Sequence, residues 1–424
     1  MRTLITLLLF LAISAPLLAQ SGAYALTNGR IETVTNGVIE RGTLLIREGR
    51  IERIGENLAI PSDAEVIDCS GLTIYPGMID AGTQLGLVEI GSLSETRDDS
   101  EMGDLTPQAQ ALTAVNPNSV AIPVTRVNGV TTVLTSPSGG LLPGTGALVN
   151  LYGYTPEQMN VAGVHVLRIN FPGRGRGGWW DHRTDEEVEE EWRSRMDKLD
   201  EVWDRAETYA RIDSAWSVGG EKRLPEYVPV IEALLPAIRR EMLVMVEVNQ
   251  ASDIDSAIAW VQRRNLRAVL SGLREGWRCA DKIAASGIPC IVGQVLTTPS
   301  RGSDRYDKPY ANPGLLRKAG VQVALRTNDV ENVRNLPFQA GFAAAYGMSR
   351  EDALRAVTIE PARIFGVDSL LGSLEVGKQA TLFVADGDPL EPSTSVRHLF
   401  INGWNVPLKS RHTDLYDEFL NRTP

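Results

Sequence analysis

The sequence predicts an α/β protein in which a (β/α)8 barrel of the TIM type is joined to a small β-sandwich built by both ends of the chain. Its 424 residues exceed one ordinary domain of about 100–200 residues. Short β-type runs with turn signals occupy both ends. Between them, apolar β runs alternate with helical patterns over about 290 residues, a length and rhythm that favour a closed barrel.

Both ends of the chain show short β-type runs separated by turn signals. "YALTNGRIETVTNGVIERGTLLIREGRIERIG" carries two Asn-Gly pairs between β runs, which indicate hairpins. "GSLEVGKQATLFVADGDP" and "VRHLFINGWNV" follow near the other end. We expect the ends to pair, because a sheet edge left open is a liability. The expected bounds are 21–75 plus 371–412 for the β-sandwich, 76–370 for the barrel and 413–424 for a tail.

The barrel prediction depends on repeated β-then-α units. "EMLVMVEVN" precedes the helical "DIDSAIAWVQRRN", and "AGVQVALRTND" precedes "NLPFQAGFAAAYGM". The chemistry of such barrels lies at the C-terminal ends of the strands. "SPSGGLLPGTGALVNLYG" is rich in glycine but lacks the GK[ST] ending of a phosphate-binding loop. We interpret it as a broad loop at the barrel mouth.

A charged helical insertion is expected at about 181–215. Apolar residues recur there at three- and four-residue steps, which indicates one apolar stripe on a long helix. The members of the stripe are Val188, Trp192, Met196, Leu199, Trp203 and Ala206. The helix either packs on the barrel, which we favour, or docks a partner.

The first 20 residues, MRTLITLLLFLAISAPLLAQ, resemble a signal peptide cleaved after residue 19 or 20. A buried helix or a membrane anchor is the alternative. The prediction is therefore an exported protein, periplasmic or secreted, and no later apolar run is long enough for a transmembrane segment. A net charge of −11 and a pI near 5.1 argue against nucleic-acid binding. Three cysteines give no disulfide framework, and Cys279 and Cys290 are expected to be buried.

One stretch, "GLTIYPGMIDAGTQLGL", resembles the first barrel strand of the amidohydrolase superfamily, especially its imidazolonepropionase-like and exported branches. Pro76, Gly77, Ile79 and Asp80 match its Pro-Gly-x-Ile-Asp pattern. "GVTTV" at 129–133 is similar to the second-strand motif. "MSREDALRAVTIEPARIFGVDSLLGSLEVGKQATLFVADGDPL" is similar to the last barrel helix and the return to the β-sandwich. The resemblance covers essentially the whole mature chain.

The resemblance implies hydrolysis of non-peptide C–N bonds, such as amides and cyclic amides, with one or two divalent metals at the barrel mouth. Such a metal lowers the pKa of a bound water and polarises the scissile carbonyl. In the family the ligands are His-x-His after strand one, sometimes Lys or Glu after strand four, His after strands five and six, and Asp after strand eight.

This chain departs from that pattern at nearly every ligand position, and it contains only four histidines. The expected ligand positions are held by Gly82, Gln84, Asn249, Gly272 and Asn328. Asp329 lies one residue after the last of these, so a shift in register restores a carboxylate there. The metal site is therefore expected to be lost, with no cofactor; zinc or another divalent metal belongs to the alternative.

Other side chains offer weaker candidates. Asp80, Glu247, Glu275 and Asp329 hold a hard cation such as Mg²⁺ or Ca²⁺ if they converge, and Asp80 and Asp329 are the catalytic candidates. A lone strand histidine, His165, is more often structural. Recognition of a ligand at the mouth is assigned to Glu247, Glu275, an Arg/Trp loop and a second polar cluster. The loop holds Arg168, Arg174, Arg176, Trp179 and Trp180, and the second cluster holds Arg326 and Arg334.

Three functions are compatible with these observations. We favour a non-catalytic amidohydrolase relative that binds a small molecule or peptide, or that serves as a partner subunit, in a homo-oligomer or beside an active paralogue. The first alternative is an active hydrolase with an unorthodox carboxylate-based site. The second is an interaction protein that uses the charged helix.

Overall fold

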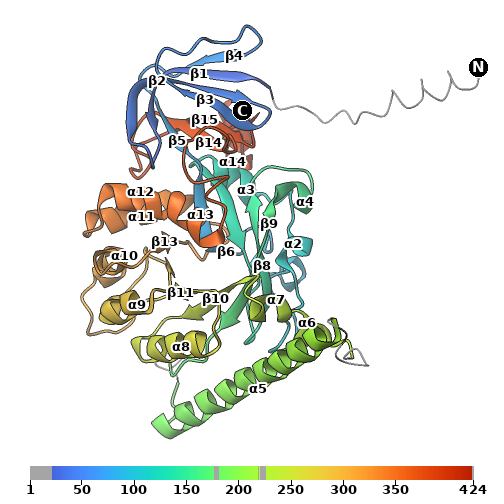
Figure 1. The fold of residues 1–424 in the computed structure, drawn as a ribbon. Coiled ribbons are helices and arrows are strands. Elements are labelled where there is room, and N and C mark those ends of the chain that lie inside the picture. Colours follow the sequence, from blue (N-terminus) through green and yellow to red (C-terminus); the bar gives the residue numbers. More distant parts are fainter. Residues whose placement is uncertain (1–21, 176–180, 218, 220–225, 423–424) are drawn as a thin grey trace, which may run out of the picture.

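The computed structural model describes residues 22–175, 181–217, 219 and 226–422, and two eight-stranded sheets organise this part of the chain (Figure 1). The predicted signal peptide lies outside the described residues. One sheet forms a small β domain at the top of Figure 1, and the other forms the barrel below it. The predicted fold class, a TIM-type barrel beside a composite β domain, is confirmed.

Both ends of the chain build the β domain. Its strand order is β16-β15-β14-β5-β1-β2-β3, with β4 paired to β1. The junction is the antiparallel pairing of β5 with β14, in which Ile74 lies opposite Val384. The strands are β1 (Tyr24–Glu32), β2 (Val38–Arg47), β3 (Arg50–Gly55), β4 (Glu65–Asp68), β5 (Thr73–Pro76), β14 (Leu382–Ala385), β15 (Val396–Ile401) and β16 (Trp404–Asn405).

The barrel sheet runs in chain order from β6 to β13. At the mouth, the Asn328 amide donates to the Gly82 carbonyl at 2.9 Å and links the two outer strands. The strands are β6 (Met78–Thr83), β7 (Val130–Thr135), β8 (Gly144–Asn150), β9 (Asn160–Asn170), β10 (Leu243–Val248), β11 (Ala268–Gly272), β12 (Cys290–Val292) and β13 (Val323–Leu325).

One barrel strand runs against the others. β8 pairs antiparallel with both β7 and β9, whereas the other neighbouring barrel strands pair in parallel. Because β8 comes from the glycine-rich segment, our interpretation of that whole segment as a loop was wrong. Every residue of β8 is buried, as expected of a strand covered on both faces.

Helices cover the outside of the barrel (Figure 1). The described helices are α2 (Ala111–Ala114), α3 (Ala121–Arg126), α4 (Pro156–Met159), α5 (Asp185–Ser217), α6 (Pro229–Glu232), α7 (Leu235–Ile238), α8 (Ala251–Arg263), α9 (Ala280–Ser286), α10 (Lys308–Lys318), α11 (Leu336–Ala345), α12 (Arg350–Ala356), α13 (Ile359–Phe365) and α14 (Arg411–Leu420). Among the described residues, none of the helices has the combination of length and apolar character that crossing a membrane requires. All three cysteines are free and buried, which confirms the predicted burial of Cys279 and Cys290.

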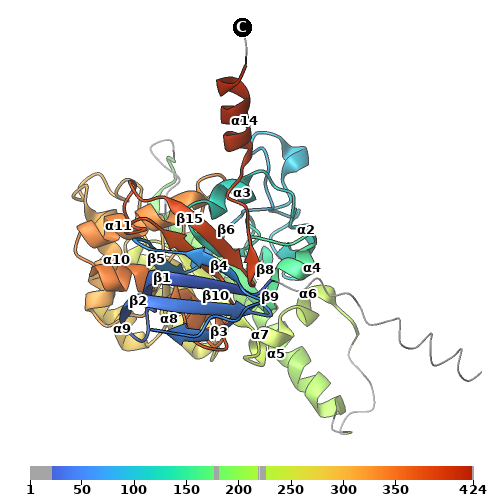
Figure 2. The ribbon, with the colours of Figure 1, turned by 90° about the horizontal axis from the view of Figure 1, so that it is seen from above.

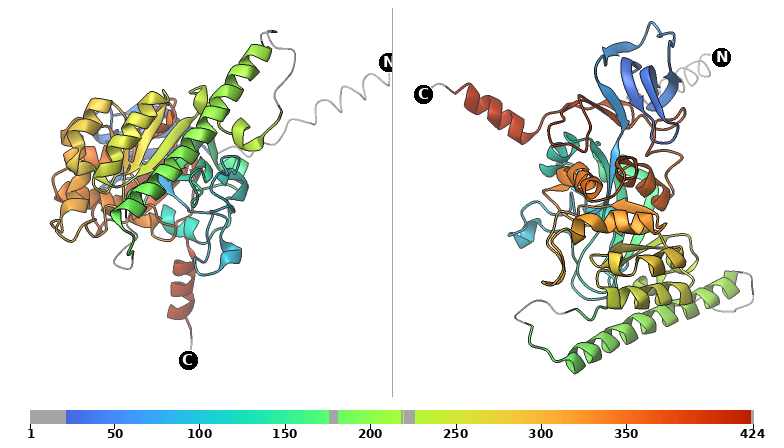
Figure 3. Two further views of the ribbon diagram at one scale, coloured as in Figure 1. Left: turned by 90° about the horizontal axis from the view of Figure 1, so that it is seen from below. Right: turned by 90° about the vertical axis from the view of Figure 1, so that its left-hand side faces the viewer.

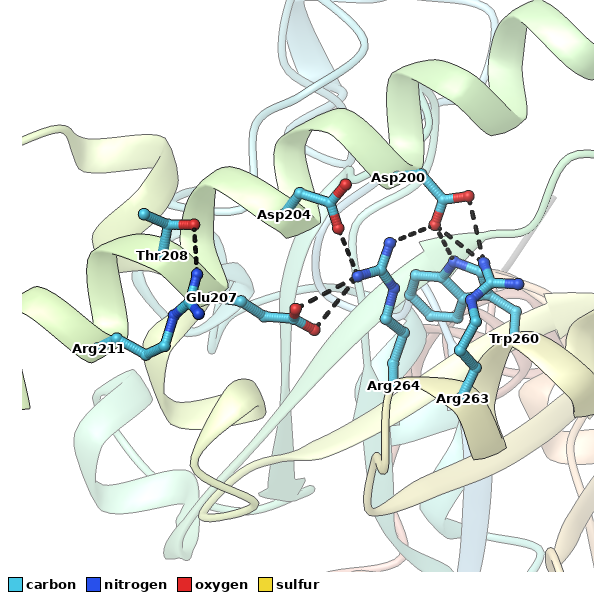
Figure 4. Close-up of polar contacts among 8 residues, drawn as sticks. All are labelled: Asp200, Asp204, Glu207, Thr208, Arg211, Trp260, Arg263 and Arg264. Carbon is cyan, nitrogen blue, oxygen red and sulfur yellow. Dashed lines mark hydrogen bonds and ion pairs between the residues drawn. The ribbon is translucent and has the colours of Figure 1, made fainter.

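Helix α5 packs across the end of the barrel far from the β domain (Figure 1). Trp203 meets Trp260 of α8 edge to face, with ring centroids 5.1 Å apart. Beside this contact, Arg264 binds Asp200 at 2.5 Å and Asp204 at 2.6 Å (Figure 4). These contacts agree with the prediction that the charged helix packs on the barrel. The alternative, that it docks a partner, stays a hypothesis.

The barrel interior is layered, and this layering places the polar site. One buried apolar layer takes a residue from successive strands, among them Val166, Met245, Val269 and Ala324. Side chains two positions apart on a strand share a face. The next layer toward the C-terminal strand ends therefore holds Arg168, Glu247, Ser271 and Arg326.

Candidate functional site at the barrel mouth

An arginine and a glutamate from facing strands form the centre of the barrel mouth. Arg326, directly after β13, donates from both terminal nitrogens to the two carboxylate oxygens of Glu247, each at 2.7 Å. Its Nη1 also lies 2.8 Å from the Ser271 hydroxyl. With Arg326 only 2% exposed, this is a buried, bidentate pair, the geometry that a planar guanidinium forms best.

A second buried arginine adds positive charge. Arg168 on β9 lies 3.8 Å from Glu247 and donates to Asn170 at 3.0 Å. Burial alone raises the pKa of Glu247, but the charges of Arg326 and Arg168 outweigh burial and hold that pKa at about 2. The carboxylate therefore stays ionised, and two guanidinium groups face this one carboxylate.

Gly82 and Gly272, at two of the expected ligand positions, have no side chains, and Arg326 and Glu247 occupy the space next to them. A Cβ added at Gly82 would lie 2.9 Å from Cδ of Arg326. A Cβ at Gly272 would lie 2.6 Å from a carboxylate oxygen of Glu247 and 2.5 Å from the Asn249 side chain. Side chains at 82 and 272 are thus incompatible with the present positions of Arg326 and Glu247.

Asp80 lies beside this cluster and holds the barrel closed. Its carboxylate accepts hydrogen bonds from the Gly82 amide at 3.0 Å, the Thr327 amide at 3.2 Å and the Thr327 hydroxyl at 2.5 Å. Complete burial raises the pKa of Asp80 to about 7, although these hydrogen bonds oppose the rise. The structure thus ties Asp80 to the segment that follows β13 through the backbone and hydroxyl donors of Thr327.

We predict that Asp80 makes stability fall as pH rises. Between pH near 4 and about 7, folded Asp80 keeps a proton that the unfolded chain has lost, so the free energy of unfolding decreases across this window and levels off above it. Asp80→Asn should remove this contribution, which is on the order of a few kcal/mol. Urea unfolding of both proteins from pH 4 to 8 measures it. Parallel curves for the two proteins would contradict the prediction.

The other predicted carboxylates serve local structure. Asp329 accepts the amides of Val330, Glu331 and Asn332 within its own loop, at 2.7, 3.1 and 3.0 Å. Glu275 accepts the Ala251 amide at the start of α8 and two donors of Arg301 at 2.5 and 2.7 Å. In the described ranges, no group of three or more His, Cys, Asp or Glu side chains is arranged to hold a metal ion.

The predicted recognition residues are separated. Arg174 stacks over the Trp192 ring at 3.4 Å and binds Glu189 and Asp253 at 2.9 and 3.2 Å, so it fastens its loop to α5 and α8. Arg334 contributes its carbonyl to Asn128. Arg176, Trp179 and Trp180 lie outside the described residues.

The residues at the remaining expected ligand positions take part in local hydrogen bonds or turns. The backbone amide of Gln84 donates to the backbone carbonyl of Asp329 at 3.4 Å. The Asn249 side chain donates to Glu247 at 3.2 Å. Asn328 has a positive φ of 49°, a conformation that asparagine tolerates better than most residues.

Sequence reasoning missed three contributors to the cluster. Arg168 was assigned to the Arg/Trp loop, which was wrong, because it belongs to β9 and is buried. Ser271 and Thr327 were not considered. The available signal was alternation: each of Arg168, Glu247, Ser271 and Arg326 follows an inward apolar residue by two positions at the end of a strand.

Known proteins that are similar to this chain include amidohydrolases. Residues 310–406 match the model of the amidohydrolase family. The crystal structure of an amidohydrolase from Thermotoga maritima MSB8 superposes with a TM-score of 0.80 at 26% identity, covering 92% of this chain and all of that one. The chain belongs to the amidohydrolase superfamily. The suspected resemblance is confirmed.

Curated relatives match parts of this amidohydrolase-superfamily chain. Amidohydrolase tasK of Hapsidospora irregularis is 24% identical over 85% of the chain, but the match spans only 39% of that protein. Imidazolonepropionase of Vibrio cholerae is 43% identical over 65 residues, which are 14% of this chain and 16% of that enzyme. The chain therefore spans well under half the length of these curated relatives in the matched regions.

Proposed function

We propose that this amidohydrolase-superfamily protein has exchanged the metal centre of its family for an internal ion pair and acts without hydrolysing C–N bonds. The main support is the bidentate contact of Arg326 with Glu247 at the centre of the mouth. A guanidinium carries fixed positive charge, but it has no open coordination position and does not lower the pKa of a water as a metal does.

The donor set supports the same proposal. A divalent metal of this family needs imidazole nitrogens and carboxylate oxygens aimed at one point. Gly82 and Gly272 supply no donor, and Arg326 lies where a side chain from 82 would begin. Glu247 accepts from Arg326 with both oxygens. These residues therefore do not fit the metal.

A partner-subunit role is the version we favour over a solitary binder. The match to tasK leaves most of that longer protein uncovered, so a related region occurs there together with further sequence. An analogous association in trans would place this barrel beside an active relative. We infer that a relative with an intact His-x-His motif is the partner, and that export brings both to the periplasm or the exterior.

A second candidate, an active hydrolase with a carboxylate-based site, has one observation in its favour. The pKa of Asp80, raised by burial to about 7, suits a general base at neutral pH. However, Asp80 is fully buried, and its oxygens already accept hydrogen bonds from Gly82 and Thr327. This candidate therefore ranks below the non-catalytic one.

Metal analysis tests the proposal directly. We expect the mature protein, purified from cells grown with added zinc, to retain less than about 0.1 metal ion per chain, because a preserved site would approach one. The Thermotoga maritima relative, prepared in the same medium, is the control. Near-stoichiometric zinc together with turnover of hydantoins, lactams or dipeptides would favour the active-hydrolase candidate.

Partner recovery tests the subunit version separately. A tagged chain purified from its native cells should retain an amidohydrolase with His-x-His, and the Arg326–Glu247 pair is not needed for that contact. If the chain elutes alone at all concentrations but shifts in melting temperature with a small ligand, the solitary binder would replace the subunit version.

A further inference from the structure

Three Asn-Gly pairs of the β domain differ in how firmly the fold holds them. Asn28-Gly29 lies in β1, Asn36-Gly37 in the loop between β1 and β2, and Asn402-Gly403 in the turn between β15 and β16. Figure 2 shows β1 and β2 side by side across the top of the molecule. Asparagine is a thermolabile residue, and it deamidates fastest before glycine, because glycine has no side chain to shield its backbone nitrogen.

The first and third pairs are restrained by hydrogen bonds. Although Asn28 is exposed, its side chain donates to Asp68 at 2.9 Å and accepts from Arg41 at 3.1 Å. The backbone nitrogen of Gly403 donates to the Ala380 carbonyl at 2.9 Å. Each of these pairs must break a bond before its asparagine side chain and its glycine nitrogen can react.

The groups that would react at Asn36-Gly37 are not restrained in this way. Both residues are exposed, and a Cβ added at Gly37 would meet nothing within 4 Å. In the described part of the chain, neither the Asn36 side chain nor the Gly37 backbone nitrogen has a hydrogen-bond partner. Thr33 holds the loop through other atoms, since its hydroxyl accepts from the Asn36 backbone amide at 2.8 Å and donates to the Gly37 carbonyl at 2.6 Å.

We propose that Asn36 is a site of spontaneous deamidation. The Gly37 backbone nitrogen gives up its proton to water or hydroxide and bonds to Cγ of Asn36, while the Cγ–Nδ2 bond breaks and ammonia leaves. Water then opens the resulting succinimide at either of its two carbonyls, which yields aspartate or isoaspartate. The reaction needs only water, so the modified form accumulates with time.

The modified position lies where the β domain meets the barrel helices, which the right-hand view of Figure 3 shows in blue and orange. Arg355 of α12 donates to the Val34 carbonyl at 3.0 Å, and the Thr35 hydroxyl donates to Glu375 at 2.8 Å. Thr35 and Gly37, on either side of Asn36, line a cavity of about 490 Å³ between the two parts. Both products add a carboxylate to this loop, and isoaspartate also lengthens its backbone by one carbon.

Timed incubation of the full mature protein at mildly alkaline pH tests the proposal. Peptide mapping by mass spectrometry should show Asn36 converted at least about tenfold faster than Asn28 or Asn402, because opening a hydrogen bond, above all one to a charged group, costs about that factor. Isoaspartate methyltransferase should label the peptide that contains Asn36. Conversion of Asn36 no faster than that of the other two would overturn the proposal.

Two variants separate the chemistry from unfolding of the protein. Asn36→Gln keeps the amide but must close a larger ring, so the charge change should disappear while the fresh protein melts at the same temperature. Asp68→Ala removes one restraint from Asn28 and should speed conversion there while Asn36 keeps its rate. An undiminished charge change in Asn36→Gln would assign the modification elsewhere, and an unchanged rate at Asn28 would remove hydrogen bonding as the cause of the order. Either result would overturn the proposal, and neither depends on whether the barrel hydrolyses anything.

Discussion

Replacing Arg326 with methionine is expected to lower the free energy of unfolding by about 3–5 kcal/mol, the cost of leaving one partner of a buried ion pair uncompensated. The variant removes both hydrogen bonds to Glu247 and the one to Ser271. Arg168, 3.8 Å away, compensates only in part. Urea unfolding at pH 7 measures the loss.

The control removes the carboxylate as well. Arg168→Met/Glu247→Leu/Arg326→Met replaces the carboxylate and both guanidinium groups that face it by apolar side chains and should recover most of the lost stability, because such replacements are often neutral or stabilising. A triple variant as unstable as the single one would show that Arg326 contributes through packing. An Arg326→Met protein as stable as the original would contradict a role for the pair in the fold.

Restoring a histidine at position 82 is expected to destabilise the protein by more than about 3 kcal/mol, because it overpacks a core position. The Cβ alone would lie 2.9 Å from Cδ of Arg326. Arg326 cannot move aside, since Glu247 and Ser271 hold it. Gly82→Ala should therefore already cost about 1–3 kcal/mol.

The steric link is tested by a double-mutant cycle. In an Arg326→Ala background, Gly82→Ala should be nearly neutral, which gives a coupling energy of about 1–3 kcal/mol. Gly302→Ala is the matched control, because a Cβ there meets nothing within 4 Å. Additive losses at 82 and 326 would show that the glycine and the arginine are independent, and the exchange of ligand for guanidinium would lose its physical basis.

The family can be recognised from the sequence because the motifs that mark its fold are short, contiguous segments. Pro76-Gly77 turns the chain from the β domain into the barrel, and β6 begins at Met78. The composite β domain was also predictable, since hairpin signals occur at both ends. The glycine-rich β8 was not predicted, because glycine and proline residues in that segment are typical of loops and its apolar run is short.

What the sequence by itself determined is the loss of donors: glycines and amides stand where imidazoles are expected, and residue identity suffices to see this. Only the tertiary structure decided what fills that space. Arg326 and Glu247 are 79 residues apart in the chain, and strand register brings them together. The ion pair at the mouth thus depends on how the strands pack. Closure of the sheet into a barrel brings the guanidinium and the carboxylate together, although they are far apart in the sequence.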